Sequence, residues 1–424
     1  MTEIFRSTIF HTPRNAFQES KALEYFEDGA LAIENGRIVS IGDYSAVAQA
    51  HPDANVQDRR AGFILPGLID THIHFPQVRI IGGLGYSLLN WLEKLTLPEE
   101  AKLADEKYAA VIAKEFIAQL AGHGTTTALV FGAHFERATE LLFEEADQVG
   151  VRVFSGLVLS DRNLRPELHQ NIPEAYEASK RLIARFGDRY VLTPRFALST
   201  TDAILDLCRA LAAEHPGLRF TTHINENPRE IEEVMRLFPR EADYLAVYEK
   251  FELIGRKSVL AHNVHPTQEE LERLACWKAT IAHCPSSNAA LGSGIFPMRR
   301  HLNAGVRFSL GTDVGGGTGF SLFKEALVAY QFQRVASNPI SLTPVQLLYL
   351  ATRAGAEALA IDGETGDFGI GKFADFIYIE PLEGGTLAAV LRESEGAERT
   401  LAAIITLVGP DDIDEVRVGG RILQ

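Results

Sequence analysis

Short apolar runs alternate with helix-like patterns from about residue 63 to residue 370 of this 424-residue chain. Such alternation is typical of a parallel β-sheet, because consecutive parallel strands must be joined by a crossover that is usually a helix. The strand-like segments are residues 63–74, 125–133, 151–160, 189–198, 218–224, 257–264, 278–285 and 306–313. Eight such units predict an α/β fold of the (β/α)8 TIM-barrel type, although the periodicity also admits an open sheet.

Both ends of the chain carry β-hairpin signals. The dipeptides at 35–36 (Asn-Gly) and 419–420 (Gly-Gly) each lie between alternating apolar residues, a pattern that favours tight hairpin turns. We therefore expect residues 1–62 and 371–424 to form one small β-sandwich domain. Residues 63–370 would then form the catalytic barrel.

The overall charge argues against two classes of partner. A formal net charge of −15 and a pI near 5.4 disfavour nucleic acid and anionic membrane surfaces, which both attract clustered Lys and Arg. The 3 cysteines include no C-x-x-C pair, and no apolar run of about 18 residues occurs. We expect a cytoplasmic protein that binds a small, uncharged substrate.

Polar residues collect where the predicted strands end, which is where barrel enzymes carry their catalytic groups. The strand-end residues are His72, His74, Arg195, His223, His262, His283 and Asp313, and Glu226 lies three positions after His223. Alternate residues of a strand share a face, so His72 and His74 are able to chelate one ion. Taken singly, each of the other groups is more often a packing or turn residue. Gathered at one barrel mouth, they indicate a metal site of a type that suits zinc.

The glycine-rich stretch 311–321 admits two interpretations. A phosphate-binding loop is one, but no Lys-Ser/Thr pair follows the glycines. We instead predict a mobile loop that lets Asp313 approach the metal. The histidines without strand-end placement are interpreted as structural or surface residues, and they are His11, His51, His123, His134, His169, His215, His265 and His301.

The motif P-G-x-[IV]-D-x-H-x-H occurs here at residues 66–74, and the chain resembles the amidohydrolase superfamily over essentially its whole length. More narrowly, several segments resemble the members of that superfamily that deaminate guanine to xanthine and ammonia. These segments are PGLIDTHIHFPQ, PRFALST, HINENPREIEEV, IAHCPSSNAALGSG and LGTDVGGG. The resemblance implies a metal-dependent barrel flanked by a small β-sandwich, and members of the superfamily often form homodimers.

The resemblance also assigns roles to individual residues. One zinc ion per chain would be held by His72, His74, His223 and Asp313. The fourth predicted strand has no lysine to bridge a second metal, which favours a single ion. Catalytic roles fall to Glu226 as proton shuttle and to His262 and Asp313, which would receive or orient the proton of the attacking water. The implied substrate-binding residues are Gln77, Arg195, Phe196, His223 and His262.

The chemistry of these side chains agrees with that assignment. Zinc lowers the pKa of bound water from about 15.7 to roughly 7, which supplies a nucleophile for the amino-bearing carbon C2. Glu226 would protonate a ring nitrogen and then help ammonia to leave. The fork of Arg195 fits the O6 and N7 acceptors of guanine, and the amide of Gln77 offers both a donor and an acceptor.

Two alternatives remain open from the sequence. Another aminohydrolase of the same superfamily, acting on a pterin, a triazine, a cytosine-like base or an adenosine-type compound, would share the metal site and differ only in its pocket. A catalytically silent barrel that serves as a binding module would lack a ligand or the acid, and neither is lacking here. The unrelated zinc deaminases carry P-C-x-x-C, which this chain does not contain.

Overall fold

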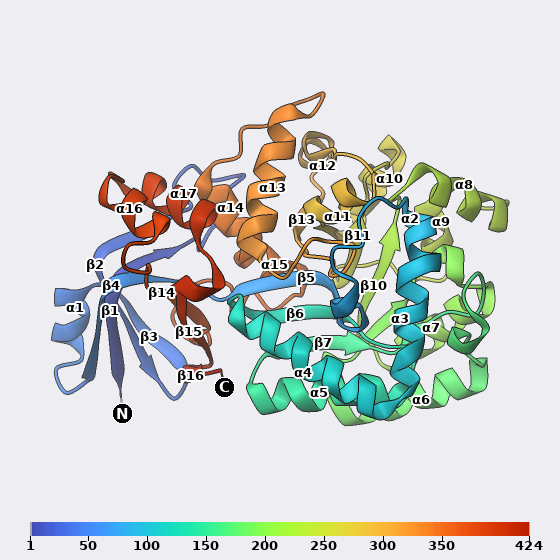
Figure 1. The fold of residues 1–424 in the computed structure, drawn as a ribbon, viewed down its shortest axis with the longest axis horizontal. Helices are drawn as coiled ribbons and strands as arrows, with labels where there is room; N and C mark the ends of the chain where they lie inside the picture. The colour runs from blue at the N-terminus through green and yellow to red at the C-terminus, as the bar shows by residue number, and fades with distance from the viewer. Residues whose placement is uncertain (1, 424) are drawn as a thin grey trace.

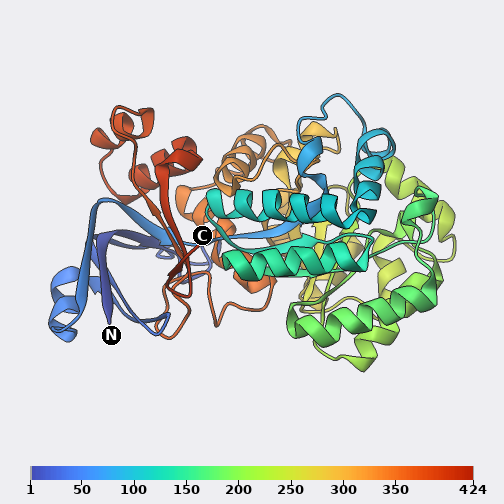
Figure 2. The same cartoon turned by 60° about the horizontal axis from the view of Figure 1, so that its bottom comes forward.

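The computed structural model describes residues 2–423. Strands from the two chain ends gather on one side of the molecule, and the alternating strands and helices form the other side (Figures 1 and 2). The chain therefore folds as mixed α/β, with one region of parallel strands and one region in which the two ends of the sequence meet.

The parallel strands lie in two sheets with the orders β5-β6-β7 and β13-β12-β11-β10-β9-β8. Their bounds are β5 (Leu68–His74), β6 (Thr125–Phe131), β7 (Arg152–Gly156), β8 (Val158–Leu159), β9 (Val191–Pro194), β10 (Arg219–Ile224), β11 (Ser258–His262), β12 (Thr280–His283) and β13 (Arg307–Leu310). Almost every residue of these strands is buried, as expected where helices cover the outer face and side chains fill the inner one.

The two parallel sheets contact each other at two places. A bridge between Ser155 and Tyr190 links β7 to the start of β9. At the other side, the Thr71 hydroxyl donates to the Leu310 carbonyl at 2.7 Å, which brings β5 against β13. Apolar side chains of six strands pack into one cluster, namely Ile69, Leu129, Phe154, Val191, Val259 and Ala282.

Helices cover the outer faces of the parallel strands (Figure 2). They are α4 (Glu106–Gly122), α5 (Glu136–Val149), α6 (Ile172–Phe186), α7 (Asp202–Glu214), α8 (Pro228–Leu237), α9 (Tyr244–Glu249), α10 (Gln268–Trp277), α11 (Pro285–Ala290), α12 (Met298–Ala304), α13 (Leu322–Val335), α14 (Pro344–Ala351) and α15 (Arg353–Ala358). Across residues 2–423, no helix combines the length and the apolar character that crossing a bilayer requires.

The chain ends contribute to a seven-stranded sheet with the order β16-β15-β14-β4-β1-β2-β3. Its strands are β1 (Glu3–His11), β2 (Glu24–Glu34), β3 (Arg37–Asp43), β4 (Asn55–Pro66), β14 (Phe376–Ile379), β15 (Ile413–Val418) and β16 (Arg421–Ile422), and the helices beside it are α1 (Tyr44–Ala50), α16 (Thr386–Arg392) and α17 (Ala397–Leu407). Both predicted hairpins are present, because β2 pairs with β3 and β15 pairs with β16. The strands are assigned to a single sheet, so the predicted sandwich stays a prediction.

Two of the strand-like segments are divided in the structure. Residues 63–66 end β4 in the seven-stranded sheet, and β5 begins only at Leu68. Gly67 separates them, where a β-carbon would lie 2.2 Å from the Thr126 hydroxyl, so only glycine fits this crossing. The third segment is divided at Leu157 into β7 and β8, each of which pairs with a different neighbour.

Candidate metal centre and pocket

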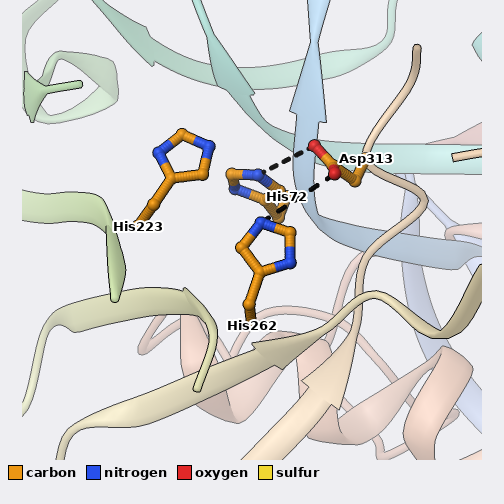
Figure 3. Close-up of side chains that lie close together, drawn as sticks. All are labelled: His72, His223, His262 and Asp313. Carbon is orange, nitrogen blue, oxygen red and sulfur yellow. Dashed lines mark ion pairs between the residues drawn. The ribbon is translucent and has the colours of Figure 1, made fainter. Parts of the chain in front are cut away.

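Four potential ligand groups converge at the carboxyl ends of the parallel strands (Figure 3). They are His72 of β5, His223 of β10, His262 of β11 and Asp313 just after β13, and one donor atom of each lies within 4.8 Å of those of the others. His72 Nε2 lies 3.1 Å from Asp313 Oδ1, and His262 Nε2 lies 3.9 Å from Asp313 Oδ2. Strands that are far apart in sequence thus deliver these side chains to one point.

His74 belongs to the same cluster. Its Nε2 lies 3.2 Å from Asp313 Oδ1 and 3.2 Å from His223 Nε2. Because His72 and His74 alternate along β5, both rings point to the carboxylate side of the cluster. All the residues predicted to be metal ligands, together with His262, therefore lie together.

The outer nitrogens of two imidazoles are fixed by hydrogen bonds. His223 Nδ1–H donates to the Arg195 carbonyl at 2.6 Å, and His262 Nδ1–H donates to Asn288 Oδ1 at 2.9 Å. Each bond leaves the Nε2 lone pair of its ring directed into the cluster. Both nitrogens of His72 are buried without a hydrogen-bond partner in the described chain, which is costly unless an ion or water satisfies them.

The protonation states also suit a cation. Burial lowers the pKa of His72, lowers that of His74 to about 4, and lowers that of His223 well below its usual value. Burial opposes ionisation of Asp313, but the close approach of the His72 and His74 rings to its carboxylate holds its pKa well below the usual range. Neutral imidazoles beside an ionised carboxylate are the forms that bind a divalent metal, so these residues fit zinc.

Glu226 lies beside the cluster on the loop after β10. Its Oε2 is 3.6 Å from His262 Nε2, and its Oε1 accepts a hydrogen bond from the Ser293 hydroxyl at 3.1 Å. Burial, reinforced by the negative charge of Asp313, raises the pKa of Glu226 to about 8. The loop is held by Glu230, which accepts the backbone N–H of Glu226 at 3.0 Å. The surroundings of this buried acid thus favour its protonated form.

A small pocket opens beside these groups. Its lining residues are His74, Gln77, Leu88, Trp91, Leu92, Arg195, Phe196, His223, Glu226, His262, Leu291 and Asp313. Every residue predicted to bind substrate is among them. The apolar side chains of Leu88, Trp91 and Leu92 were not predicted. They come from the segment that follows the turn Phe75–Ile80, where α2 (Leu88–Trp91), the π-helical turn Leu92–Thr96 and α3 (Leu97–Ala101) run on from one another.

Glu100 and His134 also lie near the pocket, and neither was predicted to belong to the site. The carboxylate of Glu100 in α3 accepts hydrogen bonds from Gln77 and Arg195, and His134, predicted to be structural, donates to the same carboxylate. Neither residue ends a parallel strand, so the strand-end rule gives no signal for them. Asn288 and Ser293 lie in the segment IAHCPSSNAALGSG. The family resemblance included this segment but assigned no role to these two side chains.

His283 shows that a strand-end position alone is insufficient. It ends β12 as predicted, yet its ring stacks on Phe296 with centroids 4.3 Å apart, and it does not line the pocket. Its ring therefore packs against an aromatic side chain instead of facing the pocket.

The glycine-rich loop is packed, in contrast to the mobile loop predicted from its composition. Asp313 N–H donates to the His72 carbonyl at 2.8 Å, and Gly317 N–H donates to the Asp313 carbonyl at 2.6 Å. A β-carbon on Gly317 would lie 1.8 Å from the Thr312 carbonyl oxygen. The glycines permit this close packing, which holds Asp313 in place.

Comparison with known proteins agrees with this geometry. Residues 63–423 match the Amidohydrolase family, and residues 29–54 match an imidazolonepropionase-like composite domain of bacteria. A "Probable guanine deaminase" of Deinococcus radiodurans is 53% identical, covering 99% of this chain and 98% of its own length. The structure titled "E. coli Guanine Deaminase" superimposes with a TM-score of 0.96 at 35% identity, covering 100% of this chain and 99% of that one.

A third protein carries a ligand. The structure titled "Crystal Structure of Guanine Deaminase from C. acetobutylicum with bound guanine in the active site" matches with a TM-score of 0.91 at 28% identity, covering 100% of both chains. The family match spans most of the sequence, and the Deinococcus relative is similar from end to end. The chain therefore belongs to the amidohydrolase family and, within it, groups with the guanine deaminases.

Proposed function

We propose that this protein is a hydrolase that converts guanine and water to xanthine and ammonia. The observation that carries the proposal is the pocket itself, in which Glu226, Arg195 and Gln77 face the same space as the His/Asp cluster. The cluster supplies what a hydrolytic deaminase needs at the reacting carbon. Arg195 and Gln77 supply hydrogen-bonding groups for a purine edge.

His72, His74, His223 and Asp313 would hold a single zinc ion. The close approach of their donor atoms, the neutral imidazoles and the ionised carboxylate support this ligand set. A bound zinc ion lowers the pKa of water from about 15.7 to roughly 7 and polarises the group under attack. Members of the amidohydrolase family are metal-dependent, in keeping with this site.

The protein's own side chains would then move the protons. Asp313 would accept the proton that water loses as its oxygen bonds to C2 of guanine, and His262, whose Nε2 lies 3.9 Å from Asp313 Oδ2, would orient that water. Glu226 donates a proton to a ring nitrogen, which removes the C2–N3 double-bond character and lets C2 become tetrahedral. The proton held by Asp313 would then pass to the C2 amino group and the C2 hydroxyl would return a proton to Glu226. The C2–N bond breaks as the C2 carbonyl forms, so that ammonia leaves and xanthine remains.

The proposal also covers the closure of the barrel, the division into domains and the oligomeric state. We infer a closed (β/α)8 barrel from the contacts that join β5 to β13 and β7 to β9. The division into a catalytic barrel (63–370) and a small β-sandwich domain (1–62 with 371–424) is supported by the separate apolar cluster of the seven-stranded sheet. A homodimer in the cytoplasm remains the expected state of the enzyme.

A substrate panel tests the function directly. Zinc-loaded protein is assayed for ammonia release from guanine, a pterin, a triazine, cytosine and adenosine. We expect guanine to give the highest kcat/KM, because the Arg195 fork matches its O6 and N7 acceptors and its C2 amine would lie at the His/Asp cluster. A protein that binds zinc but prefers one of the other bases would be a different aminohydrolase of the same family.

A further inference from the structure

The carboxylate of Glu100 is buried beside the pocket without lining it. It lies in the last turn of α3, its side chain is only 3% exposed, and three pocket-side groups converge on it. Arg195 Nη1 lies 2.7 Å from both carboxylate oxygens. Gln77 Nε2 donates to Oε1 at 2.8 Å, and His134 Nε2–H donates to Oε2 at 3.1 Å.

These contacts determine which polar atoms are left for a ligand. Arg195 gives Nη1 to Glu100, and within residues 2–423 its Nη2 and Nε donate to no protein acceptor. Gln77 uses one N–H for Glu100, and its Oε1 accepts the backbone N–H of Gly315 at 3.0 Å. One amide N–H and one lone pair of Gln77 remain. The same carboxylate therefore orients both side chains that would meet the base.

The contacts around Glu100 also determine which of these side chains are charged. Burial by itself would raise the pKa of Glu100, but the charge of Arg195 and the hydrogen bond from His134 hold it well below its usual range. Burial lowers the pKa of His134, whose Nδ1 accepts a hydrogen bond from the Ser160 hydroxyl at 3.2 Å. His134 is thus neutral, and Glu100 balances the single positive charge of Arg195.

On the basis of the guanine deamination proposed above, we infer that Glu100 is a positioning residue that makes the pocket selective for bases with an oxygen at C6. It aims the free Arg195 donors at that oxygen and fixes Gln77 beside them. A 6-oxo group accepts from these donors, whereas a 6-amino group or a bare C6–H does not. A buried donor left without an acceptor is penalised, so fixing the donors rigidly increases discrimination.

The neighbouring Glu99 provides a matched control. It lies in the same helix, is equally buried at 4% exposure, and is an acid of the same size. Its carboxylate pairs with Lys102 and with the Tyr108 hydroxyl, neither of which lines the pocket. Glu99→Gln therefore removes a buried charge from α3 without touching Arg195 or Gln77.

The test compares Glu100→Gln, Glu99→Gln and the unaltered zinc enzyme on two bases. Guanine carries the O6 acceptor, and 2-aminopurine keeps the C2 amine but lacks O6; the latter is measured as a substrate or as a competitive inhibitor. In Glu100→Gln we expect kcat/KM for guanine to fall roughly 10- to 100-fold, the effect of losing a charge-assisted hydrogen bond. The loss should lie mainly in KM, since O6 is remote from the reacting carbon. The constants for 2-aminopurine should change far less.

A double variant with Arg195→Gln strengthens the comparison. If Glu100 acts through Arg195, the two losses of selectivity will not add. If Glu100→Gln fails to fold, Glu100→Asp replaces it in the test. This variant keeps the charge but moves it away from Arg195 by one methylene. It should also lower the ratio of kcat/KM for guanine to that for 2-aminopurine. Equal losses on both bases, or a Glu100→Gln enzyme that matches Glu99→Gln, would overturn the inference while leaving guanine deamination intact. An unaltered zinc enzyme that releases no ammonia from guanine would overturn the proposed function first.

Discussion

The backbone carbonyl of Arg195 links metal binding to substrate binding at the level of a single residue. It accepts the Nδ1–H of His223, while its side chain faces the pocket through the Glu100 ion pair. A shift of this residue would therefore move the proposed metal ligand His223 and the proposed substrate contact of the Arg195 side chain together. The strand end is a favourable place for such a dual role, because both the ring and the guanidinium start from rigid β9 and β10.

Replacing the buried acid should separate catalysis from metal binding. We expect Glu226→Gln to keep its zinc, because Glu226 is not in the ligand set, and to lose roughly 10²- to 10⁴-fold in kcat, the usual span for general acid–base catalysis. Steady-state kinetics with elemental analysis of the same sample measures both. Full activity in this variant would remove Glu226 from the mechanism.

Asp313 should behave differently. Asp313→Ala removes the only carboxylate among the four convergent groups, so we expect loss of most of the zinc as well as of activity. Metal content after dialysis is the measurement. A variant that holds a full complement of zinc would show that Asp313 is misassigned as a ligand.

The convergence of the strand-end residues could be predicted because it follows from topology, whereas the choice of proposed ligands among them rested on the family resemblance. His72, His223 and Asp313 needed only the rule that parallel strands present their carboxyl ends at one edge. Glu100 and Trp91 had no such rule, since they belong to a segment folded over the pocket rather than to a strand. Their positions depend on tertiary packing that no local pattern encodes.

Among the elements, helix α13 carries a buried acid whose ionisation is coupled to folding. Glu325 in its first turn accepts the Ser286 N–H at 2.9 Å, which ties α13 to the start of α11. Burial raises the pKa of Glu325 from 4.5 to about 8. The folded state therefore holds a proton that the unfolded state has released between those values, so this group makes stability fall as pH rises from about 4.5 to about 8.

Glu325→Gln should remove that pH dependence. We expect the free energy of unfolding of the unaltered protein to decline relative to the variant across this range, by on the order of a few kcal/mol in total. Denaturant unfolding at a series of pH values gives the comparison, with zinc present throughout. Parallel curves for the two proteins would mean that Glu325 titrates normally.

Element boundaries were harder to predict than element types. The hairpin turns at Asn35 and Gly419 could be predicted from the sequence. Both residues have positive φ, 51° and 55°, a conformation that Asn and Gly adopt more readily than other residues. The division of the first apolar segment at Gly67 was not, because the same apolar run serves the end of β4 and all of β5. Composition does not reveal that the chain passes there from one sheet to another.

At the scale of the whole molecule, the cluster joins strands from distant parts of the chain, so an ion held there stabilises the folded state as a whole. Metal that binds only the folded protein adds roughly RT ln(1 + [L]/Kd), about 4 kcal/mol at a thousandfold excess over Kd. We expect chelation to lower the thermal midpoint and added zinc to restore it. Calorimetry would contradict this if the metal-free and zinc-loaded proteins unfolded at the same temperature.

The central claim is that one zinc ion at the His/Asp cluster is required for guanine deamination. It is tested most directly by titrating metal-free protein with zinc while following xanthine formation from guanine. Activity should rise linearly from a negligible value and stop rising at one equivalent per chain. Activity that is independent of zinc, or that rises until two equivalents are bound, would contradict it.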